Sequence, residues 1–97
     1  MAKDSDASDY RVTVTKSAQR DLKRLKKALN KDIFAAIDAA ILGLGADPRR
    51  PGYEALKGQS GAFRCRVGDY RILYGIDDAA KLVRIAAVGD RKEIYKH

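Results

Sequence analysis

Three arginines flank a short turn, and their spacing predicts that their side chains gather on one surface. Gly68-Asp69 separates two stretches rich in aromatic and β-branched residues, a pattern typical of a tight β-hairpin. A two-residue loop at this turn places Arg66 directly opposite Arg71, with Arg64 two residues away on the strand of Arg66. Because side chains alternate between the faces of a strand, the three arginines share one face of the hairpin. The other face holds its apolar side chains, namely Phe63, Cys65, Val67, Tyr70, Ile72 and Tyr74.

We call the surface formed by Arg64, Arg66 and Arg71 the arginine face. Like charges that lie directly opposite each other across two strands cost up to about 1 kcal/mol. A hairpin selected for stability alone would therefore place an acid or a threonine opposite Arg66. Arginine binds phosphate well because its planar guanidinium donates two parallel, charge-assisted hydrogen bonds. The pattern predicts an anion site, and a merely solvated basic surface is the alternative.

Length and composition limit the classes of protein to which the chain can belong. Its 97 residues, 45% hydrophobic and 34% charged, fit one globular domain. The net charge of +7 favours a polyanionic partner, either nucleic acid or an acidic protein segment. Cys65 is the only cysteine, which excludes an internal disulfide and a cysteine-rich zinc site, and its place on the apolar face predicts a buried, inert thiol. No apolar run reaches the roughly 18–20 residues that span a bilayer, so we expect a cytoplasmic protein without a membrane partner.

The pattern along the chain predicts an α+β fold. Residues 1–9 are polar and acidic and are expected to form a disordered leader, so that residues 10–97 make up a single domain. We expect strands at residues 10–15, 63–67, 70–76 and 82–88, two helices between residues 17 and 47, and a loop at residues 48–61. Ser17 is the expected N-cap of the first helix, with Asp21 in its first turn, and Asn30 separates the two helices. The resulting order, β-α-α-β-β-β, indicates two N-terminal helices packed on one face of a small, mainly antiparallel sheet.

Further basic residues lie outside the hairpin. Four follow the polar side of the first helix and one lies in the loop before the hairpin: Lys23, Arg24, Lys26, Lys27 and Lys57. Solvation alone explains a basic helix surface, and contact with an RNA backbone is the functional alternative. Arg91 and Tyr95 come after the last strand, four residues apart. If the chain turns back there, both can face the same cleft.

Residues 10–97 as a whole resemble the RelE family of bacterial and archaeal toxins, within the RelE/ParE superfamily. The resemblance rests on the order and spacing of four strings: YRVTVTKSAQRDLKRL, DPRRPGYEALKG, FRCRVGDYRILYGI and VGDRKEIY. It implies a small α+β toxin of a type II toxin–antitoxin system. Such a toxin cleaves messenger RNA in the ribosomal A site, inhibits translation and is neutralised by a cognate, RelB-like antitoxin. The resemblance implies neither a cofactor nor a metal ion.

The family's catalytic positions carry over to Arg64, Arg66, Arg71, Arg91 and Tyr95. The resemblance implies that the 2′-hydroxyl of the substrate attacks the adjacent phosphate. The arginines would then stabilise the extra negative charge of the transition state. Arginine stays protonated and cannot act as a general base, which leaves Tyr95 as the expected base.

Two alternatives stay open. A ParE-type toxin shares the fold and acts on DNA gyrase without being an enzyme, although such members generally lack the full set of catalytic residues. A degenerate homologue would only bind RNA or an antitoxin. Asp90, at a position where many relatives carry histidine, favours this second alternative.

Overall fold

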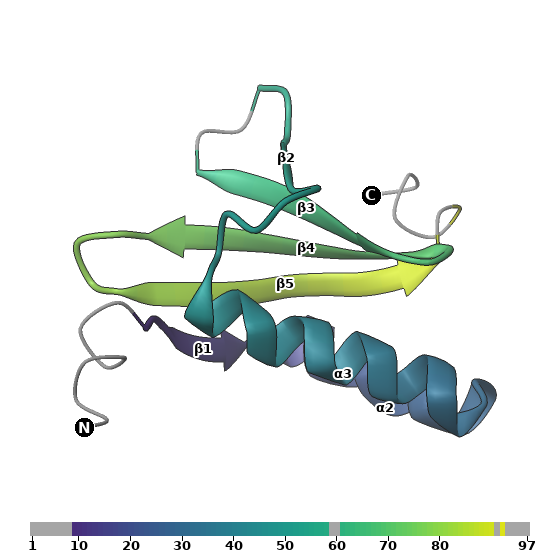
Figure 1. Cartoon of the computed structure of the whole chain (residues 1–97). Helices are drawn as coiled ribbons and strands as arrows, with labels where there is room; N and C mark the ends of the chain where they lie inside the picture. Colours follow the sequence, from purple (N-terminus) through teal and green to yellow (C-terminus); the bar gives the residue numbers. More distant parts are fainter. Residues whose placement is uncertain (1–8, 59–60, 91, 93–97) are drawn as a thin grey trace.

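The computed structural model describes residues 9–58, 61–90 and 92. The predicted leader, apart from Asp9, lies outside the described residues, as do Arg91 and Tyr95. In chain order the elements are β1 (Arg11–Val14), α2 (Lys16–Ala28), α3 (Lys31–Ala46), β2 (Glu54–Ala55), β3 (Ala62–Val67), β4 (Tyr70–Asp77) and β5 (Leu82–Asp90) (Figure 1).

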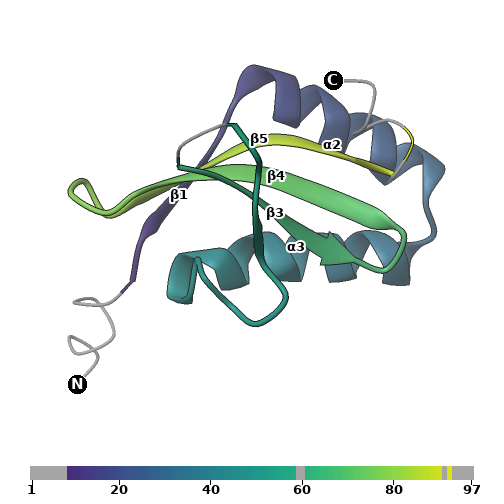
Figure 2. The ribbon, with the colours of Figure 1, turned by 90° about the horizontal axis from the view of Figure 1, so that it is seen from above.

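The strands form one sheet in the order β1-β5-β4-β3-β2. Only the pairing of β1 with β5 is parallel among the described residues; the other three pairings are antiparallel. Two helices on a small, mainly antiparallel sheet confirm the predicted fold class. The helices lie side by side on the same side of the sheet, as the two orthogonal views show (Figures 1 and 2).

The loop predicted at residues 48–61 contains a short strand, β2, so that prediction was wrong for Glu54 and Ala55. The chain turns at Gly52, whose φ of 95° is open to glycine at little cost, and then runs antiparallel to β3. Glu54 pairs with Arg64 in this register. Two residues are too few to show the alternation by which a strand is recognised in sequence.

The first helix begins earlier than predicted, at Lys16, and its N-cap is Thr15 instead of Ser17. The Thr15 hydroxyl accepts a hydrogen bond from the backbone N–H of Ala18 at 3.1 Å. Thr15 directly follows β1 and keeps the extended backbone that an N-cap requires. Asn30 caps α3 in the same way, accepting from the N–H of Ile33 at 3.0 Å, in line with the predicted break between the helices.

The prediction that Asp21 lies in the first turn of α2 was wrong, because the helix begins at Lys16. Asp21 binds a strand of the sheet instead. Its Oδ2 accepts a hydrogen bond from the backbone N–H of Val88 at 3.0 Å. This N–H lies on β5 beyond Ile85, where the pairing with β1 ends. The helix carboxylate therefore satisfies a strand donor that has lost its neighbouring strand.

One hydrophobic core lies between the helices and the sheet. Its buried members are Ala18, Leu25, Ile37, Ala40, Ile41, Leu44, Cys65, Ile72, Tyr74, Val83, Ile85 and Val88. Cys65 is buried as predicted, and burial raises the pKa of its thiol, which keeps it protonated and unreactive. In the part of the chain that the structure describes, no helix is long and apolar enough to cross a membrane.

A polar cluster around Asp78 ties three distant segments together. Arg49, which follows α3, donates two hydrogen bonds to the Asp78 carboxylate at 3.1 and 2.8 Å. The hydroxyl of Tyr10, just before β1, donates to the same carboxylate at 2.6 Å. These hydrogen bonds, that of Arg49 first, lower the pKa of Asp78 to about 2. The turn between β4 and β5 is thereby fixed to the residue before β1 and to the segment that follows α3.

Candidate functional site

The hairpin of β3 and β4 has the register predicted from its two-residue turn. Arg66 pairs with Arg71, and Arg64 pairs with Leu73. The apolar side of the hairpin packs into the core under the helices, through Cys65 and Ile72 among others. The arginine face therefore lies on the side of the sheet that the helices leave open.

Arg64 is ion-paired. Its Nε donates to Oε1 of Glu54 at 3.0 Å, and its Nη2 makes a second, shorter contact with the same oxygen. The pair is only partly exposed, with 22% of the Arg64 side chain and 48% of the Glu54 side chain accessible to solvent. Arg64 thus brings a carboxylate into the arginine face.

The Glu54 carboxylate lies in a strongly positive environment. The hydrogen bond and the charge of Arg64 lower its pKa most, and the charges of Arg66 and Arg71 lower it further. Burial acts in the opposite direction and is outweighed. Glu54 is therefore ionised at neutral pH, within the electrostatic reach of all three arginines.

Arg71 is the most buried member of the arginine face, with 6% of the residue exposed. Its Nη1 donates to the backbone carbonyl oxygens of Tyr70 at 3.2 Å and Gly68 at 3.4 Å. On β5 its partner is Gly89, which has no side chain to cover it. The hairpin itself therefore holds this guanidinium in place.

Arg66 is exposed and, among the described residues, makes no ion pair. With Arg50, Tyr53 and Glu54 it lines a hollow of about 330 Å³ at the end of β3. Of the three arginines it is the one whose guanidinium is most available to a ligand. The hollow offers a cation, an aromatic ring and a carboxylate to the same molecule.

The arrangement can bind and polarise a phosphodiester. Guanidinium groups on one open surface can hold phosphate oxygens, and the ionised carboxylate of Glu54 at the edge of that surface can accept a proton. Sequence analysis missed Glu54, because its place in the site depends on the pairing of β2 with β3. The one signal in the sequence was Gly52, two residues before Glu54, because a glycine there lets the chain turn back towards the strand that carries Arg64.

The other predicted site residues are not brought into this cluster by the described structure. Arg91 and Tyr95 lie outside the described residues. Asp90 is the last residue of β5, opposite Tyr70. Lys57 is exposed between β2 and β3. The four residues of α2 predicted to bind RNA are also exposed, but they belong to the helical layer, across the sheet from the arginine face: Lys23, Arg24, Lys26 and Lys27.

Comparisons with known proteins give consistent results. A family model described as "ParE toxin of type II toxin-antitoxin system, parDE" matches residues 12–95. Toxin RelG of Mycobacterium tuberculosis is 36% identical over 87 residues, which cover 90% of this chain and 97% of RelG. Toxin RelE of the same organism is 34% identical over 92 residues, which cover 95% of this chain and 92% of RelE. The crystal structure of the M. tuberculosis toxin–antitoxin complex RelBE2 contains a similar chain, with a TM-score of 0.71, 36% identity, and coverage of 86% of this chain and 92% of that one.

Proposed function

Because this chain belongs to the RelE family of type II toxin–antitoxin toxins, within the RelE/ParE superfamily, we propose that it is an endoribonuclease that inhibits translation. Its substrate is messenger RNA held in the ribosomal A site. The observation that carries this proposal is the arginine face, where Arg64 binds the ionised carboxylate of Glu54 and the charges of Arg66 and Arg71 act on it.

The reaction needs no protein nucleophile. The 2′-oxygen of the substrate attacks the adjacent phosphorus and the bond from phosphorus to the 5′-oxygen breaks. The leaving 5′-oxygen takes a proton from water, so the products are a 2′,3′-cyclic phosphate and a 5′-hydroxyl end. Glu54 accepts the proton of the 2′-hydroxyl. Its pKa, lowered chiefly by Arg64, keeps the carboxylate deprotonated at neutral pH but also makes it a weaker base. This assignment gives the site a base besides Tyr95.

The arginines stabilise the charge that develops on the phosphoryl oxygens. Arg66 contacts the phosphate directly, because its side chain is exposed and free of an ion pair within the described residues. Arg71, which is buried and held by the backbone of the hairpin, supplies a fixed positive charge beside the phosphate site. A preorganised donor of this kind raises the rate of cleavage roughly 10²–10³-fold.

Arg91 and Tyr95 are proposed to complete the site. Arg91 directly follows Asp90, whose partner is Tyr70 of the hairpin, so the chain leaves β5 beside the strand that carries Arg71. We assign Arg91 to the phosphate, and Tyr95 to stacking on a base or to a hydrogen bond with the 2′-oxygen.

The ribosome is proposed to hold the message in the geometry that cleavage requires, which this small site cannot impose by itself. Alignment of the 2′-oxygen with the scissile bond can contribute several kcal/mol when another molecule holds the RNA. Five exposed basic residues are proposed to bind ribosomal RNA backbone: Lys23, Arg24, Lys26, Lys27 and Lys57. We therefore expect feeble cleavage of naked RNA and strong cleavage of ribosome-bound message.

The proposed partner in the resting cell is a RelB-like antitoxin. The similar chain in the RelBE2 structure comes from a toxin–antitoxin complex. An acidic or amphipathic antitoxin segment that covers the arginine face would block the phosphate site. A chain with a net charge of +7 suits such a partner.

Expression in bacteria tests the proposal against its main rival. The rival is a non-enzymatic toxin that acts on DNA gyrase, which the name of the matching family model favours. Translation arrest that Arg66→Ala abolishes supports the ribonuclease, provided that the variant still folds and binds its antitoxin. Filamentation with a DNA-damage response and continuing translation would favour the gyrase toxin, and the absence of any phenotype would favour a homologue that only binds.

A further inference from the structure

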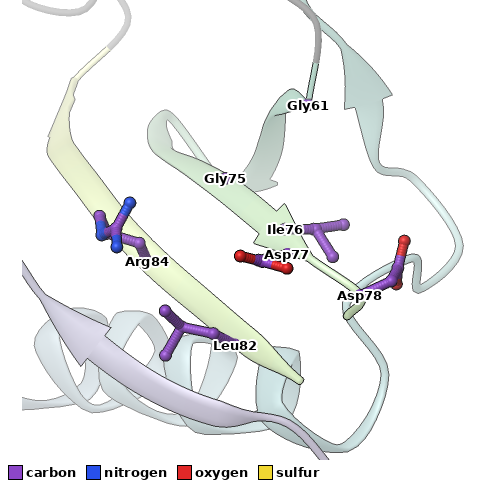
Figure 3. Close-up of a pocket in the computed structure, with 7 residues that line it drawn as sticks. All are labelled: Gly61, Gly75, Ile76, Asp77, Asp78, Leu82 and Arg84. Atoms are coloured by element: carbon purple, nitrogen blue, oxygen red, sulfur yellow. The ribbon is translucent and has the colours of Figure 1, made fainter. Parts of the chain in front are cut away.

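A second hollow lies on the open face of the sheet, away from the arginine face. It has a volume of about 390 Å³ and is lined by residues of β4, β5 and the turn between them, with Gly61 at its rim. Figure 3 shows Arg84 and Leu82 on β5, and Gly75, which has no side chain, and Asp77 on β4. None of its lining residues belongs to the candidate functional site.

The hollow exists because glycine occupies its floor. Gly75 pairs with Arg84 of β5 on one side and with Ala62 of β3 on the other. The side chains directly beside it are therefore that of Arg84 and the small methyl group of Ala62. A methyl group at Gly75 would lie 3.4 Å from the carbonyl oxygen of Gly61. Exposed backbone with no side chain above it gives a flat surface on which a planar ring can lie.

Charges line the hollow without neutralising each other. Arg84 is exposed and makes no ion pair in the described ranges 9–58, 61–90 and 92. Asp77 uses Oδ1 to accept a hydrogen bond from the N–H of Ala80 at 3.0 Å, which leaves Oδ2 for another donor. The other carboxylate that lines the hollow, that of Asp78, is paired with Arg49. Arg84 and Asp77 thus present a cation and an acceptor to the same empty volume.

The position of the hollow relates it to the arginine face. Gly75 lies four residues beyond Arg71 on β4, which corresponds to about 13 Å along a strand. Both residues belong to the same face of β4, because four is an even number of residues and β4 shows no bulge of its own between them in its pairing with β3. A polyanionic chain that crosses the open face can reach both places, with different phosphates at each.

We propose that this hollow binds a nucleotide of the substrate RNA that flanks the cleaved bond. Its phosphate lies on Arg84, its base lies over Gly75, and an exocyclic amino group of adenine or cytosine donates to Asp77. The identity of RNA as the ligand rests on the proposed function. At the position of that amino group uracil carries a carbonyl oxygen, which cannot donate a hydrogen bond to the carboxylate of Asp77.

Direct binding of RNA that cannot be cleaved tests this site without requiring nuclease activity. The probe is a fluorescent, 2′-O-methylated oligoadenylate of 12 nucleotides, titrated with the full-length protein at several salt concentrations. Each phosphate contact on a single strand contributes about 0.7 to the slope of log K against log salt concentration. Arg84→Ala should therefore lower the magnitude of the slope by about 0.7, and Arg84→Lys should restore most of it. Arg20→Ala, which removes the same charge from the exposed surface of α2, should leave the slope unchanged.

The base contact has its own readout. Asp77→Asn keeps an acceptor for the N–H of Ala80, so the turn is preserved. Loss of the negative charge favours all three probes alike, so the readout is the difference between them: binding of oligoadenylate and oligocytidylate should weaken relative to binding of oligouridylate. A uniform effect on all three probes would remove the assignment of Asp77 to the base.

The outcomes separate this inference from the nuclease proposal. If Arg84→Ala keeps the wild-type slope, or if the wild-type protein does not bind the probe, the RNA site is refuted. If Arg84→Ala weakens antitoxin binding and leaves RNA binding intact, the hollow is a protein-docking surface and the inference is also refuted. If the slope falls as expected but the wild-type protein never cleaves ribosome-bound message, the RNA site stands and the nuclease proposal fails.

Discussion

Glu54→Gln is the substitution that most sharply separates catalysis from binding in this account. Glutamine keeps the shape of the side chain and can still accept a hydrogen bond from Arg64, but it cannot take up the proton of the 2′-hydroxyl. A positioned general base typically contributes 10²–10⁴-fold, so the rate of cleavage should fall by about that factor. Binding of RNA should become tighter, because a negative charge leaves the surroundings of Arg66 and Arg71.

The assay is single-turnover cleavage of messenger RNA on programmed ribosomes, with the rate and the half-saturating toxin concentration measured separately. Asp69→Asn is the matched control: it removes an exposed negative charge from the hairpin turn next to the arginine face, without touching the proposed base. The control should cleave at the wild-type rate. Cleavage by Glu54→Gln at the wild-type rate, or an equal loss in both variants, would refute the role of Glu54.

The pH dependence follows from the same carboxylate. The pKa of Glu54 is lowered, so its charged form is favoured in the folded protein. Its contribution to the rate should therefore persist down through the ordinary glutamate range and disappear only at more acidic pH. A loss of activity with a midpoint near neutrality would point to another base.

Three further predictions concern the parts that build the site. Arg66→Ala should lower the rate of cleavage by about 10²–10³ without changing the thermal unfolding midpoint, because the side chain is exposed and acts on the phosphate alone. Asp21→Ala leaves the N–H of Val88 without its acceptor and should lower the free energy of unfolding by about 1–3 kcal/mol in urea titrations, whereas Asp21→Asn should cost much less. Asp78, with its pKa lowered to about 2, contributes stability that is fully present above the ordinary aspartate pKa and is lost as the pH falls towards 2; urea midpoints measured between pH 5 and pH 2 should fall less steeply in Asp78→Asn than in the wild-type protein.

The arginine face was predictable because a few local rules determine it. Gly68, with a φ of 59°, allows the two-residue turn, the turn fixes the register, and the register fixes which side chains share a face. The helix pair was predictable for a similar reason, since Asn30 caps α3 with its own side chain. All of these signals lie within a few residues of the structure that they specify.

What could not be predicted depends on contacts between distant segments. Glu54 reaches Arg64 because a two-residue strand pairs at the edge of the sheet, and such a strand carries no pattern of its own. Asp21 was assigned to the helix dipole from its position in the sequence, yet it binds the N–H of Val88, 67 residues away. The same limit applies to Arg84. Its access to a ligand depends on Gly75, its partner on β4, and that pairing cannot be read from either segment alone.

Analysis of the ends of the cleaved message tests the central claim most directly. Ribosomes programmed with a defined message are treated with the wild-type protein, and the chemical nature of both new RNA ends is determined. The account predicts a cut within the A-site codon that leaves a 2′,3′-cyclic phosphate and a 5′-hydroxyl, and no cut with Arg66→Ala. A 5′-phosphate end, or an intact message on ribosomes that the protein has stalled, would contradict it.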